Sequence, residues 1–156
     1  MSALARRYYV RGRGELERGD AEGACESFRA ANDLAPNFLS ARLGFAAALA
    51  TLGDGPRAAK LLRAGVARLG PESSQRARCT LWRSLGDVLV SGGDYLGAVD
   101  AFREAASIDP TDRTVDQGLA RVYAKLGRWR DSFSHLALSA GVAAPPADGS
   151  SGPRSY

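Results

Sequence analysis

Apolar residues recur at helical spacing in two segments of residues 79–112, on either side of a polar break. Gly92, Gly93 and Asp94 form the break, because glycine can take the left-handed conformation that ends a helix and aspartate can cap the next one. Proline cannot continue a helix, so Pro110 ends the second segment. The pattern predicts two helices with apolar inner faces: Trp82, Leu85, Gly86 and Leu89 on the first, and Ala98, Phe102, Ala105 and Ile108 on the second.

The same pattern repeats along the chain. Gly19, Gly53, Gly93 and Gly127 lie 34, 40 and 34 residues apart, and a small residue and then a large apolar residue follow each glycine at a constant distance. A period near 34 residues is typical of stacked helix pairs. The small residues are Ala24, Ala58, Ala98 and Ser132, the large ones are Phe28, Leu62, Phe102 and Leu136, and the repeats are residues 5–38, 39–72, 79–112 and 113–142.

The third of these units closely resembles a tetratricopeptide repeat. Leu89 replaces the aromatic residue of the family pattern, and the matching residues are Trp82, Leu85, Gly86, Ala98, Phe102 and Pro110. The resemblance implies an all-α fold, an α-solenoid of four tetratricopeptide helix-turn-helix repeats that winds as a right-handed superhelix. Gly86 and Ala98 are expected to let paired helices approach closely, and Phe102 to fill the space toward the next repeat.

The 40-residue step contains six extra residues, 73–78, which include no helix breaker. We therefore expect a helical insert there. The first helix of the third repeat should begin early, near Glu72 or Ser73, and project beyond its neighbours by about one and a half turns.

The composition changes near the C-terminus. Residues 143–156 are rich in proline, glycine and serine, which predicts a disordered tail behind a repeat domain at residues 1–142. Two prolines follow the last helix too closely for a capping helix to form, so that helix should keep apolar surface, from Phe133, Leu136 and Leu138. Either the tail folds over this strip, or the strip is a docking edge for a partner or for a second copy of the chain.

The composition otherwise suits a folded protein that is not anchored in a membrane. Apolar residues make up 45% and charged residues 24% of 156 residues, and no apolar run is long enough to span a bilayer. The first residues lack the apolar core of a secretory signal, so we expect a cytoplasmic protein unless a leader has been removed. Cys25 and Cys79 are isolated and offer neither a disulfide framework nor metal-ligand spacing.

No pattern indicates catalysis. The one histidine, His135, has no cysteine or carboxylate cluster beside it in the sequence, and neither a GxxxxGK[ST] loop nor an HExxH helix occurs. Gly12 and Gly14 lie within a predicted helix without a preceding strand, so close helix packing explains them better than phosphate binding. Glu15 and Glu17 fall on different helix faces. We expect no enzymatic activity, no cofactor and no metal site.

The resemblance implies that the first helix of each repeat lines a concave groove. Helical phase then predicts a groove floor that is small and apolar at its centre and basic at each end, which suits a peptide or an amphipathic helix with some acidic character. The predicted floor consists of Arg6, Tyr9, Val10 and Arg13, then Leu43, Gly44, Ala47 and Ala50, then Arg83, Ser84, Asp87 and Val90, and finally Gln117, Gly118, Arg121 and Lys125.

Basic residues concentrate between positions 56 and 83. Seven arginines and lysines face a single acidic residue there, although the whole chain carries only +4. This basic stretch is either a solvated convex surface or a site for an acidic protein or for nucleic acid, and the absence of interleaved aromatic residues makes nucleic acid unlikely. Its candidate binding residues are Arg57, Lys60, Arg63, Arg76 and Arg78.

Taken together, these patterns favour an adaptor or scaffold that binds a peptide or helix in its groove. One alternative is a secretion-type chaperone that holds an export substrate, because the stretch Leu43, Gly44, Phe45, Ala46 loosely resembles such proteins. The other alternative is a nucleic-acid-associated subunit that uses the basic stretch.

Overall fold

The computed structural model describes residues 2–70 and 73–143, and these residues form eight α-helices and no strand. The helices pair as the sequence pattern predicts, one pair for each repeat. They are α1 (Ala3–Glu17) and α2 (Ala21–Leu34), α3 (Leu39–Thr51) and α4 (Gly55–Arg68), α5 (Gln75–Ser91) and α6 (Tyr95–Ile108), and α7 (Arg113–Lys125) and α8 (Trp129–Ser139).

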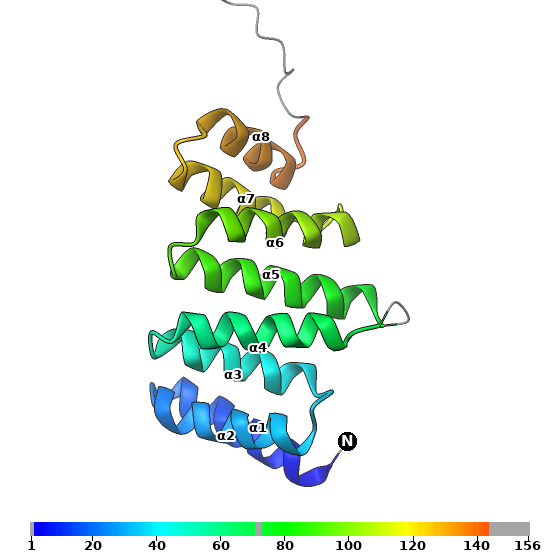
Figure 1. Cartoon of the computed structure of the whole chain (residues 1–156). Helices are drawn as coiled ribbons and strands as arrows, with labels where there is room; N and C mark the ends of the chain where they lie inside the picture. The colour runs from blue at the N-terminus through cyan, green and yellow to red at the C-terminus, as the bar shows by residue number, and fades with distance from the viewer. Residues whose placement is uncertain (1, 71–72, 144–156) are drawn as a thin grey trace, which may run out of the picture.

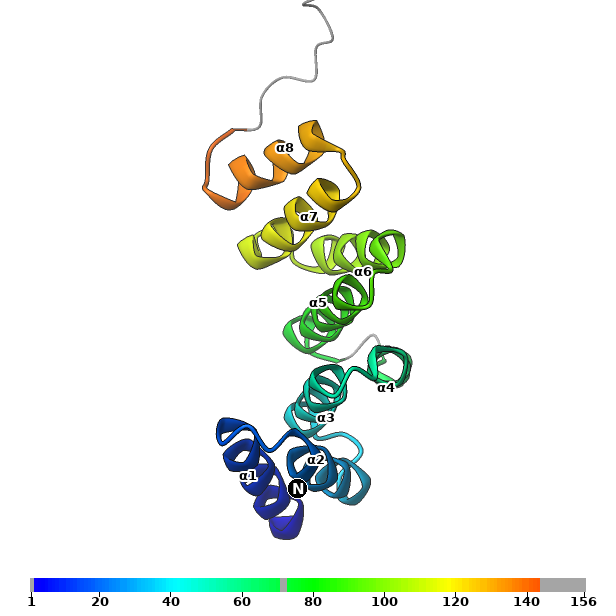
Figure 2. The ribbon, with the colours of Figure 1, turned by 90° about the vertical axis from the view of Figure 1, so that its left-hand side faces the viewer.

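The helices stack into an elongated array in chain order (Figure 1). Each even-numbered helix up to α6 packs against the odd-numbered helix before it and the one after it, and successive odd-numbered helices also touch one another. Figure 2 shows α3, α5 and α7 in one row, with α4 and α6 in a second row beside them. This arrangement is an α-solenoid, in which each repeat contacts only its neighbours.

The turns within the four repeats share one conformation. Gly19, Gly53 and Gly93 each have φ of +81°, and Gly127 has φ of +71°. A residue with a Cβ atom is strained in this left-handed region, so the repeated glycine of the sequence has a structural cause. In the first three repeats the aspartate that follows caps the next helix by accepting a hydrogen bond from a backbone N–H group, with donors at Gly23, Arg57 and Gly97.

Two phenylalanines fill sockets made of glycines. The ring of Phe28 lies between Gly12 of α1 and Gly44 of α3, where an added Cβ atom would come within 3.0 and 2.6 Å of it. The ring of Phe102 lies between Gly86 and Gly118, where the corresponding distances are 2.8 and 2.6 Å. Real Cβ atoms essentially never approach to 2.6 or 2.8 Å, and 3.0 Å at Gly12 is tighter than most real contacts, so glycine at these positions leaves the space that each ring occupies.

These sockets confirm the expected packing roles of Gly12, Gly86 and Phe102. Gly14 is different, because an added Cβ atom there would meet only the mobile guanidinium of Arg18 at 3.3 Å. Close helix packing therefore explains Gly12 and does not explain Gly14.

The insert before the third repeat is divided between a helix and a loop. Helix α5 has 17 residues, whereas α3 and α7 have 13 each. It begins at Gln75 rather than near Glu72 or Ser73, so the expected extension of one and a half turns was too long and amounts to about one turn. The cause is a turn in which the N–H group of Ser73 donates to the carbonyl of Gly70, followed by extended backbone at Ser74.

The remaining domain boundaries stay predictions. Helix α1 begins at Ala3, two residues before the repeat that the period assigns to it. The expected disordered tail lies outside the described residues except for Ala143.

Candidate functional site

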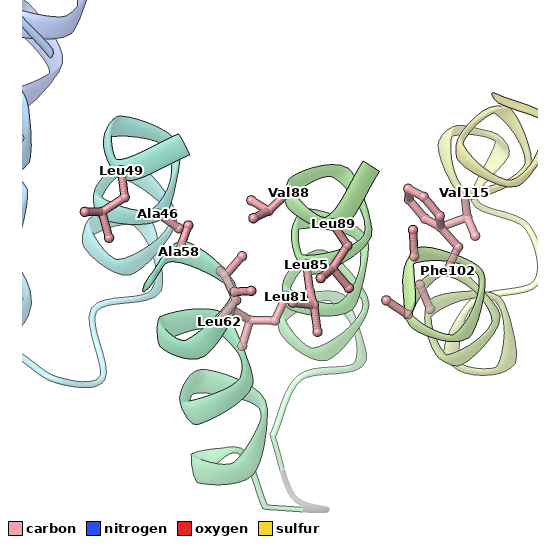
Figure 3. Close-up of a cluster of buried hydrophobic side chains, with 14 of the residues drawn as sticks. Ala46, Leu49, Ala58, Leu62, Leu81, Leu85, Val88, Leu89, Phe102 and Val115 are labelled. Carbon is pink, nitrogen blue, oxygen red and sulfur yellow. The ribbon is translucent and has the colours of Figure 1, made fainter. Parts of the chain in front are cut away.

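The joint between the second and third repeats is built from different side chains than the two phenylalanine joints. Leu62 stands at the position of Phe28 and Phe102, and it is fully buried. Ala46 and Ser84 occupy the places of the two socket glycines. Figure 3 shows Leu62 reaching from α4 toward Leu81 of α5, with Val88 pointing from α5 toward α3.

An apolar hollow of about 330 Å³ lies at this joint, between α3 and α5. Leu62 of α4 and Val88 of α5 both line this hollow. Polar groups stand on the α5 wall only, where Asp87 is exposed. The complete lining is Leu43, Ala46, Ala47, Ala50, Leu62, Ser84, Asp87, Val88 and Ser91.

A second, more polar hollow of about 870 Å³ adjoins the first and shares Leu43 with it. The N-terminal extension of α5 contributes Gln75 and Arg76 to its wall, and the end of α6 contributes Ile108, with Asp109 directly after it. The insert therefore supplies part of the wall of this polar hollow. The complete lining is Leu39, Ser40, Leu43, Gln75, Arg76, Cys79, Thr80, Arg83, Ile108, Asp109, Pro110 and Asp112.

Arg83 is held in place at the border of this polar hollow. Its Nη1 atom donates hydrogen bonds to Oδ2 of Asp112 at 3.1 Å and to Oγ1 of Thr114 at 2.8 Å. Burial raises the pKa of Asp112, but the hydrogen bonds from Thr114 and the charge of Arg83 outweigh it and hold that pKa below its ordinary value. Asp112 is therefore ionised at neutral pH and fixes the guanidinium beside the groove.

The structure brings together part of the predicted groove floor. Leu43, Ala47 and Asp87 line the apolar hollow, and Arg121 reaches it through an ion pair with Asp87. Arg83 lines the polar hollow. Neither hollow includes the remaining residues of the predicted floor, which are Arg6, Tyr9, Val10, Arg13, Gly44, Val90, Gln117, Gly118 and Lys125.

The predicted residues of the first repeat have other surroundings. Tyr9 packs against Phe28 and Phe38, with ring centroids 5.8 and 5.0 Å apart. Arg13 lies within 3.4 Å of Glu17 on the same helix. Arg6 and Val10 line an open depression beside α1 to which no other described helix contributes.

Three residues of the predicted floor line neither hollow and have packing contacts instead. Gly44 and Gly118 contact phenylalanine rings, and Val90 packs against the hydrophobic core. Val88 was missed, although it lies 40 residues after Ala48 and 34 before Val122, and all three are buried at the same position of successive repeats. That alignment was the signal that could have found it.

The basic stretch is divided between two helices. Arg57, Lys60 and Arg63 are exposed on α4, and Arg57 pairs with Asp54 at 3.1 Å. Arg76 and Arg78 lie on α5, where Arg76 lines the polar hollow. Of the five candidate residues of the basic stretch, Arg76 alone lines one of the two hollows.

The candidate reactive residues have structural surroundings. Nδ1 of His135 lies 2.9 Å from Oδ1 of Asp116, and its ring stacks on Tyr123. Burial raises the pKa of both Cys25 and Cys79, which disfavours the reactive thiolate. Glu15 is buried while Glu17 is exposed, so the two carboxylates do not converge. No helix in residues 2–70 and 73–143 is long and apolar enough to cross a membrane.

Solved structures share this architecture, although no family model and no curated protein matches the sequence. A kinesin light chain TPR-like repeat structure from Podospora anserina gives a TM-score of 0.75 at 17% identity, covering 90% of this chain and 76% of that one. A chain of the APC/C hetero-tetramer Cut9–Hcn1 gives 0.73 at 18%, covering 88% and 27%. A MamA double mutant gives 0.70 at 20%, covering 88% and 74%. The chain therefore has a tetratricopeptide-like α-solenoid fold, as the sequence resemblance predicted.

Proposed function

We propose that this chain is a non-enzymatic scaffold of the tetratricopeptide family that binds a peptide or an amphipathic helix along its α3–α5 face. The apolar hollow receives one large apolar side chain of the partner. The polar hollow beside it receives the neighbouring polar or acidic residues. Solenoids of this kind offer extended concave surfaces for such recognition.

The observation that carries this proposal is the change of side chains at the second joint. Where Phe28 and Phe102 fill their sockets, Leu62 with Ala46 and Ser84 accompanies a hollow of about 330 Å³. That volume lies at the lower end of the range of roughly 300–1,000 Å³ found for small-molecule sites. It suits a single anchoring side chain rather than a whole cofactor.

Charge favours a partner with acidic residues. Asp87 is the one acidic residue of the predicted groove floor, against five basic residues: Arg6, Arg13, Arg83, Arg121 and Lys125. Three of the five are partly neutralised, Arg13 by Glu17, Arg83 by Asp112 and Arg121 by Asp87. The attraction is therefore concentrated at Arg6 and Lys125, toward the two ends of the predicted floor. Such rim charges act mainly on association rate and specificity.

Selection of a random peptide library on the full chain tests the proposal. Selected peptides should share one large apolar residue, and Ala47→Phe, which fills the hollow from an exposed position, should weaken their binding at least tenfold. Ala64→Phe is the matched control, because Ala64 is exposed on α4 and lines neither hollow. Equal binding to the Ala47→Phe variant and to the original chain would refute the hollow as the anchor site.

The two alternatives require different probes. A secretion-type chaperone should capture a long extended segment and protect it from proteolysis. The scaffold proposed above should instead bind a peptide of about a dozen residues with full affinity. A nucleic-acid-associated subunit should bind a single-stranded oligonucleotide with steep salt dependence, and Arg76→Glu with Arg78→Glu should abolish that binding. Cytoplasmic location remains a prediction, and self-association would use α8 rather than the groove.

A further inference from the structure

An apolar stripe runs along the outer face of α8, and no described element covers it. Trp129, Phe133 and Leu136 are 61%, 62% and 46% exposed, and Ala140, directly after the helix, is exposed as well. The spacing of these residues places them on one face of a helix. The α8 stripe, as these four residues are called here, lies at the end of the stack (Figure 1).

The repeat register shows what kind of surface the α8 stripe is. The residues 34 positions earlier belong to α6, which packs against α7, and the ring of Phe102 meets Gly118 of that helix. Val99 and Phe102 are buried, and Tyr95 and Ala106 are half-buried. The α8 stripe is therefore the surface that a following helix covers in the preceding repeat. It retains the large apolar residues of a helix-packing face, in place of the polar outer face that ends most repeat arrays.

The other end of the stack, at α1, carries a polar residue where a neighbouring helix would pack. Arg7 of α1 is exposed at the position where the later repeats have the buried residues Ala41, Leu81 and Val115. Arg6 and Arg11 lie beside it along the depression on α1. The two ends differ, because α1 is polar where a neighbouring helix would pack and α8 is not.

We propose that the α8 stripe binds the α8 stripe of a second copy of this chain, with the two helices antiparallel about a two-fold axis. The midpoint of the stripe lies between Ser134 and His135, so the axis places Trp129 opposite Ala140 of the second copy and Phe133 opposite Leu136 of the second copy. Each larger side chain then faces a smaller one. A two-fold interface needs this self-complementarity, since residue i contacts j and j contacts i.

Charge also favours the antiparallel dimer over parallel packing of two α8 helices and over head-to-tail stacking of α8 on α1. Arg128 and Arg130 flank the start of α8, and Arg128 pairs with Asp131 at 2.7 Å. Antiparallel packing brings Arg130 toward the C-terminal carbonyl groups of the second copy's α8, which favour a positive charge, whereas parallel packing would bring two Arg130 side chains together. Head-to-tail stacking on α1 would place these arginines against Arg6 and Arg7.

The dimer leaves the groove open. Neither hollow contains a residue of α7 or α8, although Asp112, directly before α7, lines the polar hollow. Loss of the dimer and loss of peptide binding are therefore separate outcomes. The stripe is smaller than a standard interface, so we expect a reversible dimer with a dissociation constant on the order of 1–100 µM.

Sedimentation velocity of the full chain between roughly 1 and 500 µM tests the proposal, with concentrations chosen to span the dissociation constant expected for so small an interface. A reversible monomer–dimer equilibrium is expected, and Phe133→Glu should weaken it at least tenfold. Leu96→Glu is the matched control, because Leu96 is 71% exposed on α6 and does not belong to the stripe. A monomer at every concentration, open-ended assemblies, or an unchanged dimer in Phe133→Glu would each overturn the proposal.

A size exchange tests the register. Trp129→Ala removes the larger partner of a pair, and Ala140→Trp places two tryptophans opposite each other, so each single variant should weaken the dimer. The double variant restores one large and one small residue in each pair, so it should recover most of the original affinity. Circular dichroism and urea unfolding identify any variant whose fold has changed. A folded double variant that associates no better than the single variants would refute the antiparallel register.

Discussion

Nη2 of Arg121 donates a hydrogen bond of 2.7 Å to Oδ1 of Asp87, and the two residues occupy the same position of successive repeats, 34 residues apart. The pair joins α7 to α5 at the apolar hollow. Both side chains are more than half exposed, at 62% and 51%. Exposed ion pairs contribute little to stability, about 0–1 kcal/mol, so the pair matters chiefly for the charge that the groove presents.

Replacing Asp87 with Asn should therefore change binding more than folding. We expect the free energy of unfolding to fall by less than about 1 kcal/mol. Affinity for an acidic peptide selected on the groove should rise by about two- to fivefold at low salt, because Arg121 loses its neutralising partner, and the gain should shrink at high salt. Isothermal titration calorimetry at two salt concentrations measures this. Asp100→Asn on α6 is the control, and an equal gain there would show an effect of net charge alone.

The glycine sockets predict unequal effects for the same substitution. Gly44→Ala and Gly118→Ala place a methyl group against the rings of Phe28 and Phe102, and such overpacking should destabilise the fold by about 1–3 kcal/mol. Gly14→Ala should be neutral or stabilise the fold by about 0.5–1 kcal/mol, because alanine is the better helix former and Arg18 can move aside. Urea unfolding measures all three. A similar loss in all three variants would show that the sockets are not the cause.

The fold could be predicted from the sequence because its signals are local and repeated. The left-handed turns seen at Gly53 and Gly93 require glycine, and this glycine recurs near every thirty-fourth residue of the sequence. An aspartate after the glycine caps the next helix. The predicted start of α5 was wrong because the N–H group of Ser73 donates to the carbonyl of Gly70 and the backbone of Ser74 is extended, so the helix begins after both residues. The sequence shows that six residues are extra, but not how they are shared between helix and loop.

The site could be predicted only in part, because helical phase does not give the relative sizes of facing side chains. Phase selected Leu43, Ala47 and Asp87, which line the apolar hollow, but the hollow depends on Leu62 facing small residues from two other helices. Outside the two hollows, the burial of Arg42 had no signal in the sequence. Arg42 is 4% exposed in the core, where its Nη2 atom donates to the carbonyl of Pro36 at 2.6 Å and burial lowers its pKa.

The turn glycines provide a test of backbone strain with a neighbouring control. Gly93→Ala should cost about 1–2 kcal/mol, because φ is +81° and no described atom lies within 4 Å, so strain is the only cost. Gly92 has φ of −82°, which alanine adopts freely, so Gly92→Ala should be neutral or slightly stabilising. Urea unfolding compares the two. Equal losses at both positions would contradict the assignment of the effect to φ.

The buried carboxylate of Glu15 stands at the repeat position that Leu49, Leu89 and Tyr123 occupy in the later repeats, and it should make the stability of the fold depend on pH. Oε2 of Glu15 accepts a hydrogen bond of 2.6 Å from the hydroxyl of Ser27, and Oε1 accepts one of 2.7 Å from Nε of Arg11. The hydroxyl of Ser27 lowers the pKa of Glu15 below its ordinary value, burial acts in the opposite direction, and Arg11 again lowers it. The charged form is thus the stable one in the folded protein.

Because the pKa of Glu15 is lower in the folded state than in the unfolded state, its contribution is present above the ordinary value of 4.5 and is lost as the pH falls through the folded-state pKa. Ser27→Ala should cost about 1–3 kcal/mol at pH 7, since it leaves Oε2 of the buried Glu15 carboxylate without its donor while Arg11 still serves Oε1, and the cost should shrink toward pH 3. Glu15→Gln should flatten the loss of stability in acid, whereas Glu17→Gln, at an exposed position, should not. Urea unfolding of the four proteins between pH 3 and 7 measures these differences. A cost of Ser27→Ala that stays constant across this range would show that the hydroxyl does not stabilise the charged form of Glu15.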